Sequence, residues 1–307
     1  MIKALKQQAV RFHKYGKSDQ LILDNMTLPI LSDKEVLVRI IAAGVNPIDW
    51  RLREGFKQVP LPSIPGAEAS GIIESIGKEV TSFEVGQEVY GAIDHSYAEY
   101  ALASPEMIFL KPAHLSFEEA AAAGGGKTAW GALFEVGQLQ KGQRILIHGA
   151  SGGVGVFAVQ LAHQAGAYVI ATCSAENLSF VKSLGADEVI DYKITAFEQV
   201  VKDVDTVFDM VGGETLENSY GIIKPGGTLL SIVQPPSNEK AAHFGIRALW
   251  GGTKTVAAMR TIDALLQAGK LQPVVRKVFN SLSQAALAQD YSQQGGKGRG
   301  KVVLRVS

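Results

Sequence analysis

The segment RILIHGASGGVGVFAVQLAHQAG, which begins at Arg144, constrains the fold more than any other part of the chain. Its apolar run Ile145–Ile147 is typical of a buried parallel strand. The pattern Gly153-x-Gly155-x-x-Ala158 then fits G-x-G-x-x-G/A, and apolar residues follow it at helical spacing. Such glycines let the backbone turn sharply and let a pyrophosphate approach the helix N-terminus. We therefore expect a dinucleotide-binding turn rather than a glycine-rich turn that binds nothing.

Composition excludes several other classes of protein. The 307 residues include 30 basic and 30 acidic side chains, which gives no general electrostatic affinity for nucleic acid or anionic membranes. No apolar run has the length of a membrane span, and the start MIKALKQQAV lacks the apolar centre of a signal peptide. The single cysteine, Cys173, excludes an internal disulfide framework. We expect a cytoplasmic protein with no membrane or nucleic-acid partner.

The first part of the chain, residues 1–116, has the pattern of an all-β region. Its short runs are rich in Val and Ile and are separated by Gly, Pro, Asp and Ser clusters. The predicted strands are Lys6–Val10, Leu21–Met26, Glu35–Ala43, Gly71–Ile76, Gln87–Tyr90 and Tyr97–Leu102.

From residue 117 to 269 the pattern changes to alternating strands and helices. Ser116 and Glu119 form a capping box that predicts one helix through Ala120–Leu133. The alternation that follows predicts a doubly wound parallel sheet with helices on both faces. The tail, residues 270–307, returns to short strands and is expected to pack on the first region. The predicted segments after the glycine turn are Tyr168–Thr172, Glu176–Leu184, Glu188–Ile190, Thr206–Asp209, Thr228–Val233, Thr255–Ala268, Val274–Phe279, Gln284–Tyr291 and Lys301–Val306.

Several motifs together resemble the zinc-independent branch of the medium-chain dehydrogenase/reductases, the quinone oxidoreductase group. They are NPID at 46–49 with Arg53, PGAE at 65–68 with Gly71, GASGGVG at 149–155, LGADEVIDY at 184–192 and GRGKVVLRV at 298–306. The resemblance covers nearly the whole chain. It implies an α/β fold in which a GroES-like, mainly-β substrate domain is formed by both chain ends and a Rossmann domain lies between them. It also implies a homodimer, joined through the edge of the Rossmann sheet near Thr228–Val233 or 244–249.

A zinc ion is not expected. Zinc-bearing relatives place a cysteine near position 46 and a histidine at position 67, where this chain has Asn46 and Ala67. Zinc requires three or four Cys, His or carboxylate ligands, and the six histidines show no paired helical spacing. Glu68 survives from the zinc pattern, and we interpret it as a structural carboxylate.

The expected cofactor is NADPH, with NADH less favoured. NAD enzymes usually end the second strand with an acid that binds the ribose hydroxyls, and here that position is the small, neutral Ser174. Tyr192 and Lys193, which follow the next strand, are expected to border the 2′-phosphate, and Asn177 stands where relatives often carry lysine. Glu176 opposes this interpretation because a carboxylate near a phosphate repels it, although an acid in the first turn of a helix is favourable without any cofactor.

The resemblance supplies the remaining site residues. It implies that Asn46 lies on the nicotinamide-ribose side of the cleft and acts with Asp49 and Arg53 in catalysis. An i,i+4 ion pair between Asp49 and Arg53 is at least as well supported as direct catalysis by them. Lys127, in the run Gly124–Thr128, has no assigned role. The cofactor-binding set implied is Asn46, Thr128, Gly149, Ser151, Gly152, Gly153, Val154, Gly155, Ser174, Asn177, Tyr192, Val211 and Gly212.

The expected activity is reduction of quinones or α,β-unsaturated carbonyls by direct hydride transfer from NADPH, without zinc. The sequence contains no Ser-His-Asp arrangement and no carboxylate pair suited to hydrolysis. The alternative is a non-catalytic NADPH-binding protein of the zeta-crystallin type, and turnover of NADPH with an enone or a quinone distinguishes the two.

Overall fold

The computed structural model describes residues 6–252, 255–295 and 298–306. The start of the chain, on which the absence of a signal peptide was predicted, lies partly outside these residues. The described chain divides into two units. Unit 1 contains the residues up to Gly124, those from Pro273 to 295 and those from Lys301 onward, and unit 2 contains Gly125–Gln272 and Gly298–Gly300. The sequence predicted boundaries after 116 and 269 and no return of 298–300 to the central unit.

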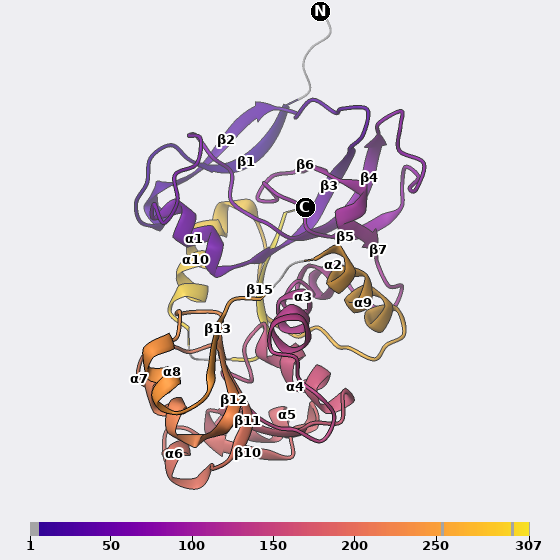
Figure 1. Cartoon of the computed structure of the whole chain (residues 1–307). Helices are drawn as coiled ribbons and strands as arrows, with labels where there is room; N and C mark the ends of the chain where they lie inside the picture. The colour runs from indigo at the N-terminus through magenta and orange to yellow at the C-terminus, as the bar shows by residue number, and fades with distance from the viewer. Residues whose placement is uncertain (1–5, 253–254, 296–297, 307) are drawn as a thin grey trace, which may run out of the picture. The chain divides into compact units, whose positions relative to one another are not determined.

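Unit 1 is built on a seven-stranded sheet and a two-stranded antiparallel sheet. The larger sheet has the order β14-β15-β3-β4-β5-β7, and β6 pairs with β3. Figure 1 shows the yellow C-terminal elements α10 and β15 beside α1 and β3 from the start of the chain. The elements are β1 (Lys6–Phe12), β2 (Leu21–Thr27), β3 (Val36–Val45), α1 (Pro47–Arg53), β4 (Ala69–Ile76), β5 (Glu88–Gly91), β6 (Tyr100–Ala103), β7 (Ile108–Leu110), α2 (Phe117–Ala121), β14 (Val275–Phe279), α10 (Ala285–Gln293) and β15 (Lys301–Arg305).

Unit 2 is a parallel six-stranded sheet of order β10-β9-β8-β11-β12-β13. Helices α4 and α5 lie on one side of these strands and α7 and α8 on the other (Figure 1). The elements are α3 (Gly125–Trp130), β8 (Arg144–His148), α4 (Gly155–Gln164), β9 (Tyr168–Cys173), α5 (Leu178–Ser183), β10 (Glu188–Asp191), α6 (Phe197–Val200), β11 (Val204–Asp209), α7 (Gly213–Ser219), β12 (Ile223–Ser231), α8 (Asn238–His243), β13 (Arg247–Trp250) and α9 (Val256–Gln267).

The strand order confirms the predicted doubly wound fold. From β8 the chain builds β9 and β10 on one side, and it then returns to build β11, β12 and β13 on the other. The carboxyl ends of β8 and β11 therefore flank the point at which the order reverses, where α/β folds of this type bind their ligands. Ile145, Leu146 and Ile147 in β8 have no exposed surface, as the apolar run predicted.

The single helix predicted over Ala120–Leu133 is wrong. The capping box at Ser116 is present, but α2 ends at Ala121 and α3 begins at Gly125, followed by a π-helical turn. The break lies at glycines that are in close contact with distant parts of the chain. A Cβ on Gly124 would lie 1.4 Å from Glu68 Oε2, and one on Gly125 would lie 2.1 Å from the Gly153 carbonyl oxygen. Long-range packing, which capping and composition do not encode, therefore interrupts the helix.

Candidate functional site

The predicted dinucleotide turn lies at the carboxyl end of β8, in unit 2. Gly149 begins the turn with φ of +73°, a conformation that L side chains rarely adopt. Gly155 opens α4 so close to the start of the turn that a Cβ there would lie 2.2 Å from the Gly149 carbonyl oxygen. Both positions therefore require glycine. Ser151, Gly152, Gly153 and Val154 lie between them, and all four are partly exposed.

Two of the other predicted cofactor contacts flank this turn. A Cβ on Gly149 would lie 3.5 Å from Val211 Cγ2, so Val211 is adjacent to the turn. The loop that carries Val211 is fixed by Asp209, a fully buried residue at the end of β11. Asp209 Oδ1 accepts the backbone N–H groups of Val211 and Gly212, each at 3.0 Å. Thr128 is on α3, the helix that packs on the turn through Gly125.

The end of β9 carries a hydrogen-bonded cluster that includes a residue the sequence interpretation missed. Asn177 Nδ2 donates to Ser174 Oγ at 3.1 Å, and Asn177 Oδ1 accepts from Arg299 Nε at 3.0 Å. Arg299 also donates to the Glu176 carbonyl oxygen at 2.8 Å, and its guanidinium lies 4.7 Å from the centre of the Phe180 ring. A cation therefore stands at the end of β9, next to Asn177 and the opposing Glu176.

Arg299 reaches this position because its neighbour is bonded to the glycine turn. The Gly300 N–H donates to the Ser151 carbonyl oxygen at 2.8 Å, and Gly300 forms a parallel bridge with Gly152. The sequence signal for Arg299 is the basic segment GRGK at 298–301. Tyr192, the remaining predicted contact in this unit, follows β10 and is 51% exposed.

These features fit a dinucleotide cofactor. The turn leaves its glycines partly exposed at the switch point of the sheet, next to the start of a helix whose free N–H groups favour an anion. The small, buried Ser174 and the cationic Arg299 lie together at the end of the second strand, where a ribose is bound in this fold. A dinucleotide that carries extra negative charge on this ribose is compatible with Ser174 and Arg299.

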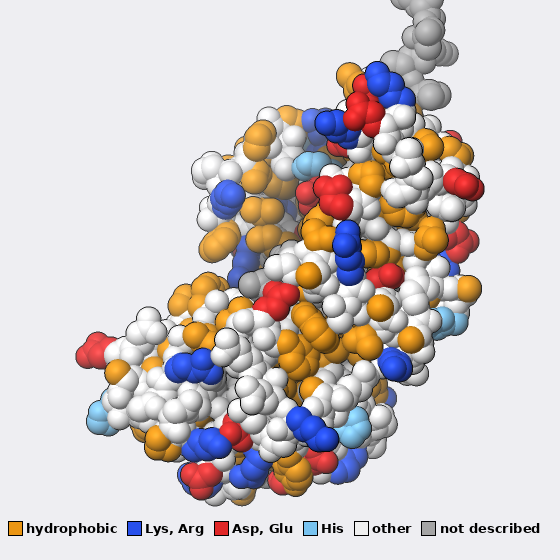
Figure 2. Space-filling view, turned by 45° about the vertical axis from the view of Figure 1, so that its right-hand side comes forward, with side chains coloured by type: hydrophobic (Ala, Val, Ile, Leu, Met, Phe, Trp, Pro, Cys, Tyr) orange, Lys and Arg blue, Asp and Glu red, His pale blue; other side chains and the backbone are white. Residues whose placement is uncertain are grey.

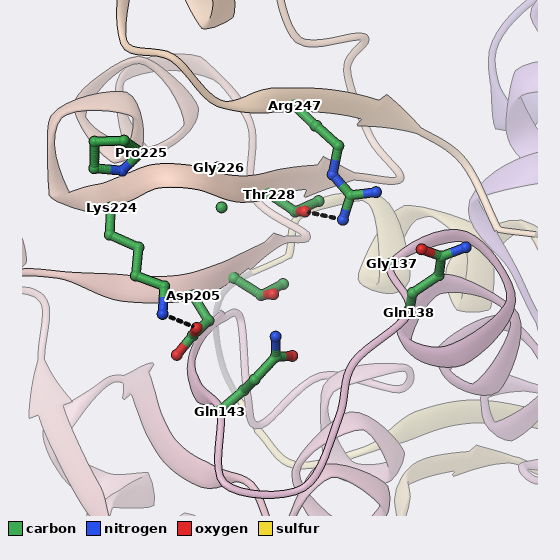
Figure 3. Close-up of a pocket in the computed structure, with 11 residues that line it drawn as sticks. Gly137, Gln138, Gln143, Asp205, Lys224, Pro225, Gly226, Thr228 and Arg247 are labelled. Atoms are coloured by element: carbon green, nitrogen blue, oxygen red, sulfur yellow. Dashed lines mark hydrogen bonds and ion pairs between the residues drawn. The ribbon is translucent and has the colours of Figure 1, made fainter.

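A separate polar cavity of about 220 Å³ lies at the opposite, amino ends of the same strands. Figure 3 shows Lys224 directed toward Asp205, and Arg247 toward Thr228. Both cations therefore already have partners within the cavity. Because the glycine turn is at the carboxyl edge of the sheet, this cavity is not the predicted cofactor site.

The predicted catalytic residues belong to unit 1. Asn46 precedes α1, and its N–H donates to Asp49 Oδ2 at 2.8 Å. The Asn46 side chain donates from Nδ2 to Glu68 Oε1 at 3.0 Å. Lys301, the first residue of β15, donates to the Asn46 amide oxygen and forms an ion pair with Glu68. The sequence interpretation named Asn46 and Asp49 and missed Lys301.

Asp49 is buried among hydrogen-bond donors. Besides the Asn46 N–H, it accepts from the Tyr97 hydroxyl at 3.2 Å and the Gly66 N–H at 3.3 Å. Burial raises the pKa of the Asp49 carboxyl from 3.8 to about 7, against the opposing effects of the Asn46 hydrogen bond and the Lys301 charge. Asp49 is only 2% exposed, so we assign it to holding the backbone of Asn46.

The i,i+4 ion pair considered for Asp49 and Arg53 is wrong, because the two side chains bind different partners. Arg53 has no exposed surface and donates from Nε to Gln289 Oε1 at 2.9 Å. Its other donors bind the Gly16 carbonyl oxygen and Glu54. Arg53 thereby ties α1 to α10, which came from the far end of the sequence and was not considered as its partner.

The residues at the zinc position do not fit a metal. Among the described residues, no group of three or more His, Cys, Asp and Glu side chains is placed to hold one. The Lys301 ammonium contacts both Asn46 and Glu68, so a divalent cation bound to these two side chains would be repelled by it.

Two further observations concern the predictions about membranes and nucleic acid. In the part of the chain that the structure describes, no helix is long and apolar enough to cross a membrane. On the face drawn in Figure 2, Lys and Arg side chains are interspersed with acidic and apolar ones.

Comparison with known proteins identifies the family. A family profile described as "Alcohol dehydrogenase GroES-like domain" matches residues 32–114, and one described as "Zinc-binding dehydrogenase" matches residues 184–304. The chain is 35% identical to the 2-methylene-furan-3-one reductase of Solanum lycopersicum, over 97% of this chain and 79% of that protein. It is 33% identical to a mitochondrial NAD(P)H oxidoreductase of Danio rerio, over 95% of this chain and 89% of that protein.

A solved structure agrees with these sequence matches. The quinone oxidoreductase from Coxiella burnetii superposes with a TM-score of 0.90 at 32% identity and covers 99% of this chain and 100% of its own. The predicted family resemblance is thereby confirmed, and the chain belongs to the quinone oxidoreductase group of the medium-chain dehydrogenase/reductase family.

Proposed function

We propose that this protein is an NADPH-dependent reductase of quinones and conjugated enones that works without zinc. The names of its relatives support both acceptor classes, since they include a quinone oxidoreductase and a furanone reductase. The observation that carries the proposal is the side-chain cluster of Asn46, Glu68 and Lys301. This cluster offers a neutral N–H donor beside an ammonium group, in place of a set of metal ligands.

This chemistry suits a conjugated acceptor better than an alcohol. An alcohol must lose its hydroxyl proton as hydride leaves, and related dehydrogenases use a metal to acidify that oxygen. A quinone or an enone instead develops negative charge on its carbonyl oxygen, which needs only hydrogen-bond donors. We propose that the Asn46 amide is such a donor, that Asp49 holds its backbone, and that Arg53 supports α1. When bound, NADPH supplies the hydride.

The cluster at the end of β9 supports NADPH over NADH. Arg299 is an exposed cation that is fixed by Asn177 and stacked on Phe180. A guanidinium recognises phosphate oxygens through its rigid array of N–H groups. We propose that Arg299 and Ser174 bind the 2′-phosphate, that Asn177 orients Arg299, and that Tyr192 borders the same phosphate. The Arg299 charge also offsets the repulsion expected from Glu176.

The proposal is tested with an acceptor panel assayed with NADPH and NADH in parallel. 9,10-Phenanthrenequinone and an alkenal should be reduced, with NADPH preferred, and a simple secondary alcohol should not be oxidised with NADP⁺. Turnover of the alcohol and of neither acceptor would overturn the proposal. Binding of NADPH with no turnover of any acceptor would favour the alternative, a non-catalytic NADPH-binding protein. Metal analysis of the purified protein tests the proposed absence of zinc.

We also propose a homodimer that forms through the free edge of the unit 2 sheet. Among the described residues, β13 pairs with β12 alone, and Trp250, the last residue of β13, is 49% exposed. An unpaired strand edge is a surface that a second copy can extend or cover. Light scattering across micromolar concentrations should give twice the monomer mass, and a monomer at all concentrations would contradict the proposal.

We also propose that the protein is located in the cytoplasm. The Danio rerio relative is mitochondrial by name, so homology does not favour one compartment. Cell fractionation with an antibody to this protein distinguishes the two locations.

A further inference from the structure

Three strand ends meet at Asn46, and their register explains why. The antiparallel pairing of β15 with β3 places Val302 opposite Val45, which brings Lys301 to the side of Asn46. The Gly44 N–H donates to the Glu68 carbonyl oxygen at 3.0 Å, just before β4 begins. Residues distant in the sequence thus bring an ammonium and a carboxylate to the same amide group.

The two charged groups can be satisfied by only one orientation of that amide. An ammonium only donates hydrogen bonds, and an ionised carboxylate only accepts them. Lys301 therefore binds the amide oxygen of Asn46, and Glu68 binds its Nδ2. If the amide turned over, its N–H groups would face the ammonium and its oxygen would face the carboxylate. Both charge-assisted hydrogen bonds would be replaced by repulsive contacts.

Burial strengthens this preference. Glu68 is 5% exposed and Lys301 is 8% exposed, so water competes little for either charge. The Glu68 carboxylate is also confined by backbone, because a Cβ on Gly44 would lie 2.5 Å from Oε1 and one on Gly124 would lie 1.4 Å from Oε2. The group that fixes the amide is therefore itself fixed in place.

The backbone of Asn46 is held independently of its side chain. Its N–H donates to Asp49 Oδ2 at 2.8 Å, and Pro47 restricts it to the extended conformation that is observed, with φ of −117° and ψ of 153°. One of the two side-chain amide hydrogens is directed to Glu68. Among the described residues, no acceptor contacts the other hydrogen, so it is available to a ligand.

We propose that Lys301 is a positioning residue, which together with Glu68 sets the orientation of the Asn46 amide so that its second N–H is presented to the carbonyl oxygen of the acceptor. This inference rests on the proposed function, in which Asn46 donates to that oxygen. Lys301 does not touch the acceptor. It acts by fixing which end of the amide faces Glu68 and by polarising the amide through its oxygen, which strengthens the remaining N–H as a donor.

The kinetic test replaces both charges at once, because Lys301→Met alone would leave a buried, unpaired carboxylate. Lys301→Met/Glu68→Gln removes the constraint on the amide and keeps the site neutral. We expect kcat with 9,10-phenanthrenequinone to fall by between about tenfold and a hundredfold, the range associated with a misplaced catalytic group. The KM for NADPH should change by less than about twofold, because neither Lys301 nor Glu68 is among the residues proposed to bind the cofactor. Lys301→Arg, which keeps a cationic donor, should retain more of kcat than Lys301→Met.

The same pair of substitutions in an Asn46→Ala background tests whether Lys301 acts through Asn46. If it does, the pair should lower kcat little further, because residues that act as a unit are not additive. An equal fractional fall in both backgrounds would overturn the inference, as would a pair variant with the kcat of the parent. Thermal melting of each variant checks that it is folded.

Unit 1 offers a matched control in Lys111, which forms a 3.0 Å ion pair with Glu88 and whose side chain is 6% exposed. Lys111→Met/Glu88→Gln also removes an ion pair with a buried lysine, and it should leave kcat unchanged. If the control lowers kcat as much as the test pair, the effect comes from general loss of an ion pair and the inference is wrong.

A cofactor-free measurement separates failure of this inference from failure of the proposed function. The Asn46 side-chain resonances are assigned by their loss in Asn46→Ala. Because Lys301 binds the amide oxygen, Lys301→Met should move the Asn46 side-chain 13C and 15N shifts, whereas Lys111→Met should not. Unchanged shifts would overturn the inference even if the protein is an active reductase. A parent protein that reduces no acceptor, with the expected shift changes, would instead overturn the proposed function.

Discussion

The Nε of Arg299 donates to the Asn177 Oδ1 at 3.0 Å and joins two residues that are 122 positions apart in the sequence. This hydrogen bond places a guanidinium beside Ser174, at the end of the second strand of the parallel sheet. Ser174 was predicted from sequence to accommodate a 2′-phosphate and Lys193 to border it, but Arg299 was not identified.

Arg299→Gln should weaken NADPH binding and leave NADH binding nearly unchanged. A hydrogen bond to a charged group contributes about 1.5–3 kcal/mol, which corresponds to a rise in the dissociation constant of roughly tenfold to a hundredfold. Fluorescence titration with each cofactor measures the change. Arg305→Gln is the control, because Arg305 is bonded to Glu118 in unit 1. Equal weakening for NADPH and NADH would exclude recognition of the 2′-phosphate by Arg299.

Asn46→Ala should lower kcat for a quinone by about a hundredfold, because loss of one donor to a developing oxyanion has an effect of that order. The affinity for NADPH should fall much less. Steady-state kinetics at saturating acceptor, with a separate titration of NADPH, measure the two effects. A variant with the parental kcat would show that the amide makes no bond specific to the transition state.

Gly124→Ala should destabilise unit 1. The added Cβ would lie 1.4 Å from Glu68 Oε2, and Glu68 is held by Lys301 and Asn46. Overpacking of this kind typically costs about 1–3 kcal/mol in the free energy of unfolding. Gly221→Ala is the matched control, because its Cβ would meet nothing closer than Phe244 Cε1 at 3.7 Å. Urea denaturation of both variants should show a fall in the midpoint for Gly124→Ala alone.

His148 should make the protein less stable in acid. Its ring is 1% exposed and lies between Thr172 Oγ1 at 3.0 Å and Ser219 Oγ at 3.2 Å. Burial lowers the pKa of His148 from 6.5 to about 3, so the unfolded state binds a proton that the folded state does not. Above pH 6.5 His148 is neutral in both states and does not lower the free energy of unfolding. As the pH falls from 6.5 toward 3, His148 lowers the free energy of unfolding by about 1.4 kcal/mol per pH unit.

The measurement is the free energy of urea unfolding at several values of pH between 4 and 8. A His148→Gln variant should lose less stability over the acid part of this range than the parent protein. Parallel curves for the two proteins would show that His148 takes up its proton equally in the folded and unfolded states.

Asp49 should make the protein less stable as the pH rises, which is the opposite of the effect of His148. Its pKa is raised from 3.8 to about 7, so the folded state keeps a proton that the unfolded state has lost. Relative to high pH, Asp49 adds to the free energy of unfolding. This added stability is fully present below pH 3.8 and is lost as the pH rises toward 7. Asp49→Asn resembles the protonated carboxyl, so its stability should decline less between pH 4 and 7 than that of the parent protein. Chemical denaturation across this range measures the difference, and a larger decline in the variant would contradict it.

Local patterns were sufficient for the Rossmann part of the fold. The apolar run Ile145–Ile147, the glycines after it and the helical spacing from Val154 all act within a short stretch of chain. The structure has β8, the turn and α4 where these patterns place them. The prediction of a single helix through Gly124 was wrong because the cause of the break lies outside the local sequence. Its break is caused by Glu68 and Gly153, which are distant in sequence and leave no local signal.

The same distinction explains which site residues were identified. Asn46 was named through a motif, but its partner Lys301 arrives on the last strand, and no spacing rule links positions 255 residues apart. Arg53 was paired with its helical neighbour Asp49 because i,i+4 geometry allows it, whereas its partner is Gln289 on α10. Hydrogen bonds between distant segments decide both roles, and only the folded chain brings those segments together.

The position of β15 within the sheet of unit 1 has a consequence for synthesis of the chain. β15 is made after the other strands of this sheet, yet it lies between β14 and β3 and not at the edge. Until β15 is made, β3 has β4 on one side and β6 along Val36–Arg39 on the other, but its segment Ala42–Val45 has no neighbour on that second side. A nascent chain would therefore expose part of a strand edge that favours pairing with other chains until β15 emerges. All six strands of unit 2 precede β15 in the chain, so we expect the sheet of unit 2 to form first and β15 to complete the sheet of unit 1 afterwards.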